Sequence, residues 1–187
     1  MAVVAALAAS QAATAAPDSA KGVAAAPPAV WIRGFCGAFV SWKKTAEAGA
    51  AKVQRSLAQL EHPKLADLPA VKRELVDFLH GVSTASDRLH ALIAKLGPPS
   101  IPNGSKLEAT LNRATSQVAS AYRRLWQQAT RISTNPLRMV AQATKLGKDI
   151  SAAGNKQAAA FSALGQYSSS ALDRAAASEP SCKALTG

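Results

Sequence analysis

The sequence is poor in the residues that build most catalytic centres. Its 187 residues include 2 cysteines, 3 histidines and 11 aspartates and glutamates. The histidines, at His62, His80 and His90, do not form the i, i+4 pair on one helix face that binds a metal ion. No Gly-x-Ser-x-Gly elbow, phosphate-binding glycine loop or dinucleotide fingerprint is present. We therefore predict a protein that is not an enzyme and that carries no cofactor and no metal.

Long apolar runs are also missing. A helix that crosses a bilayer needs about 20 apolar residues, whereas the apolar run at residues 2–9 is much shorter, so we expect no transmembrane helix. That run, followed by Ala13-Thr14-Ala15, predicts a signal peptide over residues 1–15. No Lys or Arg precedes the run, and the alternatives are a start further upstream or a plain Ala/Pro tail. We expect a secreted or cell-envelope protein.

The remaining chain divides into a linker and one domain. Residues 16–28 are rich in Ala and Pro and show no apolar periodicity, which predicts a disordered linker. Residues 29–187 are long enough for one domain with its own core. We expect this domain to be a monomer.

The domain has a helical pattern throughout. In residues 71–96, apolar side chains recur at alternating steps of four and three, at Val71, Leu75, Phe78, Val82, Ala85, Leu89, Leu92 and Leu96. Residues 107–132 repeat this spacing and residues 32–60 follow it too. A fourth segment carries a weaker apolar face at Val140, Ile150, Ala153, Phe161, Leu164 and Leu172, and closes at Pro180. The pattern predicts an all-α, antiparallel four-helix bundle with up-down-up-down topology.

The two cysteines agree with an even number of helices. Cys36 lies early in the first helical segment and Cys182 lies at the end of the fourth. An even number of helices returns the chain to the end of the bundle where it began, whereas three or five would separate the sulfurs beyond the ~7 Å Cα limit of a bridge. We predict a Cys36–Cys182 disulfide that ties the bundle. Two buried free thiols are the alternative.

Several motifs give the chain a family resemblance. They are the aromatic start of the first segment (Trp31, Phe35, Phe39, Trp42), the loop at residues 97–104, and the closing Glu179-Pro180-Ser181-Cys182. With these motifs the chain resembles a group of uncharacterised small secreted or lipid-anchored helical proteins of actinobacteria. The resemblance implies export to the cell envelope and a helical bundle, but no activity. Members of that group tend to be acidic, whereas this chain has a formal net charge of +11.

Part of the positive charge forms a line on the third segment. Lys106, Arg113, Arg124 and Arg131 follow steps of 7, 11 and 7, which places them within roughly 40° of one another on an ideal helix. We call these four residues the basic stripe. It is either a solvated face or a track for a polyanion, such as an anionic polymer of the envelope.

Two functions follow from these features. The first is a structural or interaction protein of the envelope that binds an anionic polymer or an acidic protein surface; export argues against nucleic acid. The second is a bundle that carries a small apolar ligand, lined by the Trp- and Phe-rich start of the first helix.

Overall fold

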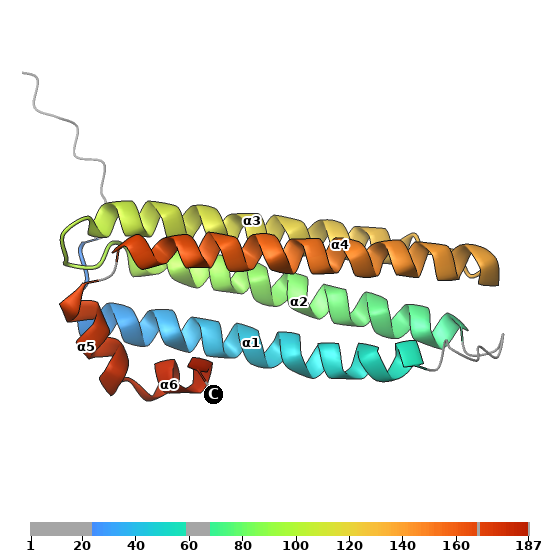
Figure 1. Cartoon of the computed structure of the whole chain (residues 1–187), viewed down its shortest axis with the longest axis horizontal. Coiled ribbons are helices and arrows are strands. Elements are labelled where there is room, and N and C mark those ends of the chain that lie inside the picture. The colour runs from blue at the N-terminus through green and yellow to red at the C-terminus, as the bar shows by residue number, and fades with distance from the viewer. Residues whose placement is uncertain (1–23, 59–67, 168, 187) are drawn as a thin grey trace, which may run out of the picture.

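The computed structural model describes residues 24–58, 68–167 and 169–186. Figure 1 shows four long helices that run alternately up and down: α1 (Pro28–Ala58), α2 (Leu68–Leu96), α3 (Gly104–Thr130) and α4 (Pro136–Ser162). A 3-10 helix η3 (Ala163–Tyr167) and two short helices, α5 (Ser170–Ser178) and α6 (Pro180–Thr186), follow. No strand occurs in these ranges, and one isolated bridge joins Ala26 to Pro99. The predicted antiparallel four-helix bundle is confirmed.

The loop between α2 and α3 holds the segment that precedes α1. Gly97 ends α2 with a left-handed backbone (φ 64°), and Asn103 takes the same conformation before α3 (φ 61°). Between them, the Ala26 amide donates to the Pro98 carbonyl at 2.8 Å, and the Ser100 amide donates to the Ala26 carbonyl at 2.7 Å. Ala26 of the predicted linker is therefore held against the α2–α3 loop, and Pro28, also assigned to the linker, is the first residue of α1. The predicted signal peptide (1–15) and linker residues 16–23 lie outside the described residues.

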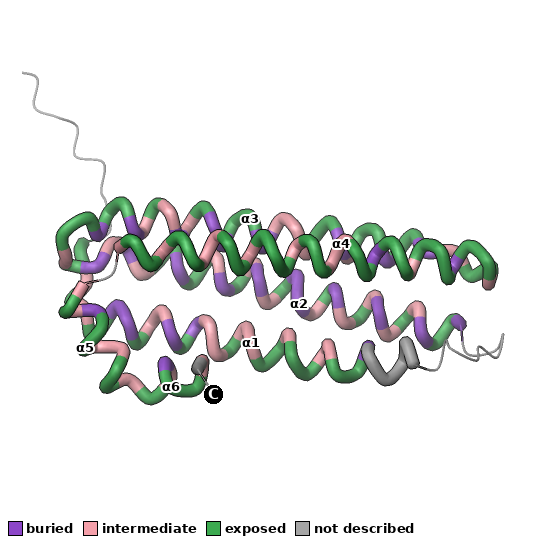
Figure 2. The backbone as a smooth tube through the Cα atoms, in the orientation of Figure 1, coloured by how far each residue is buried: buried purple, intermediate pink, exposed green. Residues whose placement is uncertain are grey.

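The core is divided along the bundle axis into two clusters. The disulfide-end core gathers Trp31, Ile32, Cys36, Leu89, Ile93, Leu107 and Leu111. The far-end core gathers Val53, Leu68, Val71, Leu75, Leu79, Leu125, Ile132, Met139 and Leu146. Figure 2 shows the buried positions recurring on the inner faces of the helices. On α2 the predicted seam residues Val71, Leu75, Val82 and Leu89 are buried. The buried face also takes in Leu79 and Ile93, whereas the predicted Leu92 is 42% exposed.

Buried polar side chains occupy the level between the two cores. The Trp42 indole Nε1 donates to Ser86 Oγ at 2.9 Å, and this hydroxyl donates to the Val82 carbonyl at 2.7 Å. Thr115 Oγ1 lies 3.0 Å from His90 Nδ1. Tyr122 packs edge-on against Trp42 at this level, and burial raises its pKa. Because Trp42, Ser86, His90 and Thr115 are hydrogen-bonded, the polar level is compatible with a buried interior.

The fourth predicted helix is broken, which corrects the prediction of one helix that closes at Pro180. α4 ends at Ser162, and a new helix starts after Ser169, whose Oγ accepts from the Leu172 amide at 3.3 Å. Gly165 and the serines that follow it favour turns and caps over a helix interior. The inward face of α4 is also different, because its buried residues are Met139 and Leu146 and the expected Val140 is 47% exposed.

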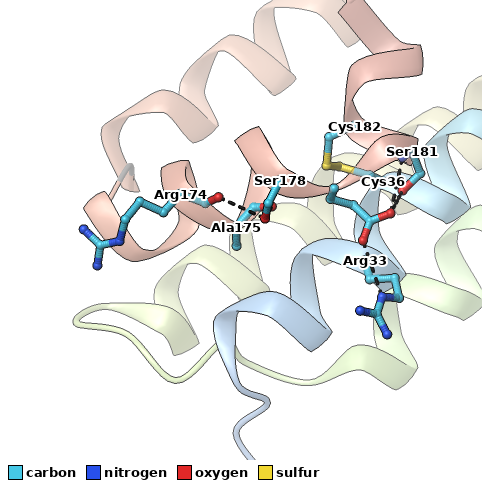
Figure 3. Close-up of a disulfide and its surroundings, with 8 residues drawn as sticks. Arg33, Cys36, Arg174, Ala175, Ser178, Ser181 and Cys182 are labelled. Atoms are coloured by element: carbon cyan, nitrogen blue, oxygen red, sulfur yellow. Dashed lines mark hydrogen bonds and ion pairs between the residues drawn. A yellow bond between two sulfur atoms is a disulfide. The ribbon is translucent and has the colours of Figure 1, made fainter.

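The predicted Cys36–Cys182 disulfide is confirmed, with Cα atoms 5.0 Å apart (Figure 3). α4 returns the chain to the end where α1 begins, and there Phe161 meets Phe39 edge-on at 4.9 Å. α5 and α6 then turn back along α1. Cys182 therefore approaches Cys36 from α6 and not from the end of a fourth long helix.

Candidate functional site

The basic stripe on α3 reaches two different parts of the surface. Lys106, Arg113, Arg124 and Arg131 are all exposed. Lys106 lies beside the loop at residues 98–105, at the disulfide end of the bundle. Arg124 and Arg131 lie further along α3 and line hollows between α3 and α4. Arg113 is not among the residues that line these hollows, so the stripe does not act as one continuous wall.

The hollows between α3 and α4 join into a groove. The first encloses about 310 Å³ and the second about 210 Å³, and both are lined by Arg124 of α3 and Lys156 of α4. A third, of about 300 Å³, shares Gln128 with the second and adds Arg131 and Lys145. We call this feature the α3–α4 groove. It brings cations from two helices to one concave surface.

Small residues on both helices form the floor of the α3–α4 groove. On α4, positions seven apart face inward, at Met139, Leu146, Ala153 and Ala160. Met139 and Leu146 are buried in the far-end core and Ala153 packs against it, while Ala153 and Ala160 line the first hollow. Ala114 and Ala121 line the opposite wall. The first hollow therefore lies where the inward side chains of α4 are alanines and no longer Met or Leu.

The rim of the groove combines cations and amides. Gln117 and Gln157 join Arg124 and Lys156 around the first hollow. Within the described residues, no side-chain hydrogen bond or ion pair engages Arg124, Arg131 or Lys156. The neighbouring Arg123 differs, because it pairs with Asp87 of α2 at 2.6 Å. Arg124, Arg131 and Lys156 are therefore available to a ligand.

The charged side chains around the α3–α4 groove are positive over a long stretch of sequence. Residues 109–148, which span most of α3 and the first half of α4, contain no Asp or Glu. Asp149 lines the groove and pairs with Lys145 at 2.7 Å, so it offsets one of the rim cations. The groove can supply guanidinium, ammonium and amide donors to an anionic chain, and these are the donors that phosphate and carboxylate oxygens accept from.

The α4 half of the groove was missed by the sequence interpretation. Lys145 and Lys156 have no regular spacing with the basic stripe, since they lie on another helix. The acid-free stretch includes Lys145, and the seven-residue recurrence of Met139, Leu146, Ala153 and Ala160 indicates which face of α4 points inward.

Another hollow, separate from the α3–α4 groove, lies at the disulfide end. It encloses about 320 Å³ and is lined mainly by apolar side chains, including Trp31, Phe35, Leu164, Tyr167 and Leu172. Trp31 and Phe35 stack with ring centroids 5.1 Å apart. η3 and α5 supply one wall. The predicted aromatic start of α1 therefore lines an apolar hollow.

The described residues include no group of three or more His, Cys, Asp or Glu that could hold a metal ion. The His80 ring packs on Trp126 in a tilted arrangement with centroids 4.8 Å apart, and His62 lies outside the described residues. Within the described ranges, no helix has both the length and the apolar character required to cross a membrane. No protein-family model, curated protein or solved structure matches the chain.

Proposed function

We propose that this protein is an extracytoplasmic interaction module, without catalytic activity, that binds an extended anionic polymer of the cell envelope along the α3–α4 groove. The observation that carries the proposal is the convergence of Arg124 and Lys156, unpaired within the described residues, on one groove. Arg124 belongs to a stretch without Asp or Glu, residues 109–148, and the acidic side chain that lines the groove, Asp149, is engaged by Lys145 at 2.7 Å. The disulfide supports the location, because disulfides persist mainly in oxidising compartments.

The shape of the groove favours a chain over a compact anion. Its three hollows follow one another between α3 and α4, and each carries at least one cation. A flexible polymer with regularly spaced phosphates or carboxylates can contact several of these cations in turn. Each contact releases counterions, so the affinity falls as salt rises.

The test measures the affinity of the full chain for linear inorganic polyphosphate over a range of salt concentrations. The groove variant Arg124→Glu/Lys156→Glu should flatten the slope of log K against log salt by about 1.4, since each contact contributes about 0.7 on flexible chains. The control variant Arg73→Glu/Arg88→Glu changes the net charge equally at exposed positions on α2. It should retain most of the wild-type slope.

Two outcomes overturn the proposal. If both double variants lose affinity for polyphosphate equally, the overall charge and not the groove attracts the polymer. If neither double variant loses affinity, the groove is a solvated face that does not bind the polymer. A third variant, Arg113→Glu, separates the groove from the basic stripe, because Arg113 belongs to the stripe and not to the groove. If Arg113→Glu lowers the affinity for polyphosphate more than Lys156→Glu alone does, the polymer lies over α3 and not in the groove.

The apolar hollow at the disulfide end supports a second candidate, a carrier of a small apolar ligand. Trp31 is 3% exposed and its indole Nε1 donates to the Gly97 carbonyl at 3.0 Å, so the lining is rigidly held. Titration with an uncharged fluorescent naphthylamine probe should then saturate at one probe molecule per chain, with an affinity that does not depend on salt concentration. Unsaturable binding would count against a carrier.

A further inference from the structure

The outward side of α4 carries an uncovered apolar surface. Leu137 is 87% exposed and Val140 is 47% exposed, and Ala141 is exposed beside them. On an ideal helix these three residues fall within about 100° of one another. We call them the outer α4 face. It lies on the side of α4 away from the buried Met139 and Leu146.

Cations border the outer α4 face. Arg138 follows Leu137 directly, and Lys145 and Lys148 lie two to three turns further along the helix. Arg138 and Lys148 make no side-chain hydrogen bond or ion pair with a described residue. The acidic residue nearest in sequence, Asp149, is engaged with Lys145 at 2.7 Å. An apolar strip bordered by basic residues is the arrangement of helices that lie in a membrane interface.

The start of α4 is held so that Leu137 stays outside. Asn135 caps the helix by accepting from the Arg138 amide at 3.4 Å, and Pro136 occupies the first turn. The Ser133 amide donates to Gln142 Oε1 at 2.7 Å across the same turn. Met139, 1% exposed, fixes the rotation of α4 from the inner side. Leu137 cannot be buried without rotating Met139 out of the far-end core.

We propose that the outer α4 face docks on the surface of a bilayer that contains anionic phospholipids. Leu137 and Val140 would enter the headgroup layer, and Arg138 and Lys148 would contact lipid phosphates. This inference does not rest on the α3–α4 groove, because none of the three apolar residues lines it. It accounts for the exposed leucine and its basic border together.

Two other occupants fit the outer α4 face less well. A soluble polyanion would satisfy Arg138 but would leave Leu137 in water. A second copy related by a two-fold axis would bring the unpaired Arg138 and Lys148 of one copy close to those of the other, and like charges in contact oppose association. An anionic bilayer offers both an apolar interior and negative charge at its surface.

The test compares binding of the full chain to vesicles of phosphatidylglycerol and phosphatidylcholine with binding to vesicles of phosphatidylcholine alone. We expect binding to the anionic vesicles, and a loss of about tenfold in the variant Leu137→Ser/Val140→Ser. The control is Val30→Ser, which removes another exposed apolar side chain (57% exposed) at the opposite end of the bundle. It should bind as the wild type does.

A second readout reports insertion locally. The variant Leu137→Trp should gain a blue-shifted emission component when anionic vesicles are added, relative to the wild-type spectrum, and brominated lipids should quench it. Absence of both changes overturns the proposal. So does a concentration-dependent dimer that Leu137→Ser/Val140→Ser dissociates, because that result assigns the face to a second copy.

The two proposals fail separately. If the outer α4 face docks on lipid, its serine variant still binds polyphosphate as the wild type does, and the groove variant Arg124→Glu/Lys156→Glu still gives the Leu137→Trp emission change. Vesicle binding that the serine variant does not weaken overturns lipid docking without bearing on the groove.

Discussion

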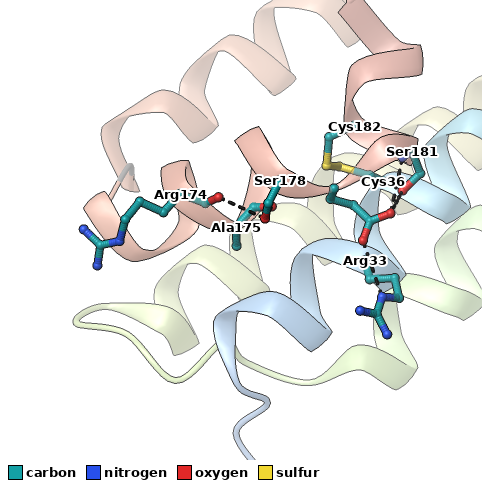
Figure 4. A network of polar contacts seen from close by, with 8 residues as sticks. Arg33, Cys36, Arg174, Ala175, Ser178, Ser181 and Cys182 are labelled. Carbon is teal, nitrogen blue, oxygen red and sulfur yellow. Dashed lines mark hydrogen bonds and ion pairs between the residues drawn. A yellow bond between two sulfur atoms is a disulfide. The ribbon is translucent and has the colours of Figure 1, made fainter.

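Glu179 joins three elements near the disulfide. Its Oε2 accepts from Arg33 Nε at 3.4 Å, and its Oε1 accepts from the Ser181 hydroxyl at 2.8 Å and from the Ser181 amide at 3.3 Å. Figure 4 shows Arg33 and Ser181 close to the Cys36–Cys182 bridge. The Ser181 hydrogen bonds, with a smaller contribution from Arg33, lower the pKa of Glu179 below its ordinary value of 4.5. One carboxylate therefore orients the start of α6.

This lowered pKa predicts acid sensitivity at the C-terminal end. A carboxyl group with a lowered folded-state pKa stabilises the fold above its unfolded pKa, and that stabilisation is lost as pH falls through the lowered value. The melting temperature of the wild type should therefore drop more below about pH 4.5 than that of Glu179→Gln, measured from pH 7 to pH 3. Glu47→Gln, another surface carboxylate, is the control. If the melting temperatures of the wild type and Glu179→Gln fall in parallel as the pH is lowered, the Glu179 carboxylate does not stabilise the fold in this way.

At the scale of elements, Gly104 fixes how the α2–α3 loop meets α3. A Cβ built on Gly104 would overlap the carbonyl oxygen of Pro99, which belongs to the backbone and cannot move aside easily. Gly147, in the middle of α4, has open space at the same position. The backbone around Gly104 therefore requires a residue without a Cβ, whereas that around Gly147 does not. Alanine substitutions should have opposite effects on stability at the two positions.

We expect Gly104→Ala to destabilise the protein by about 1–3 kcal/mol, as overpacking does. Gly147→Ala should stabilise it by about 1 kcal/mol, because alanine favours the helix and meets no obstacle. Urea unfolding of both variants measures the difference. Stabilisation by Gly104→Ala would show that the loop adapts and that the close approach to Pro99 is not required.

The sequence predicted some elements better than others. The seams of α2 and α3 are long, regular and rich in leucine, so their existence and direction followed from the spacing. On α2 the predicted seam is right at its buried members Val71, Leu75, Val82 and Leu89. It missed Leu79 and Ile93 and included the exposed Leu92, because only packing against two neighbouring helices decides between adjacent apolar residues. On α4, alanine replaces leucine in the second half, and Val140 was mistaken for an inward residue.

At the scale of the whole molecule, half of the candidate site could be predicted. Arg124 and Arg131 belong to a stripe whose spacing is visible within one helix. Lys145 and Lys156 reach the same groove only through the packing of α4 on α3. That packing depends on the rotation of a helix whose periodicity is weak, so the groove became apparent only in three dimensions.

The disulfide joins the last helix to the first and should carry much of the stability of the C-terminal segment. α5 and α6 are short and pack mainly on α1, and within the described residues their buried side chains are Leu172 and Cys182. Closing a loop with a sequence separation of 146 contributes at most ~5 kcal/mol in the chain-entropy model. Since 1 kcal/mol corresponds to about 2–4 °C in a domain of this size, Cys36→Ser/Cys182→Ser should lower the melting temperature by up to about 10–20 °C.

Removal of the disulfide by Cys36→Ser/Cys182→Ser should destabilise some helices of the bundle more than others. Amide hydrogen exchange should rise first in α5 and α6, whereas α2 and α3, which pack tightly on each other, should keep their protection. Polyphosphate binding at the α3–α4 groove should persist at temperatures below the new transition, because neither cysteine of the bridge lines the groove. Mass analysis without reductant should identify the Cys36–Cys182 peptide in the wild type. Unchanged exchange in α6 after the substitution would mean that packing on α1, and not the bridge, holds the C-terminal helices.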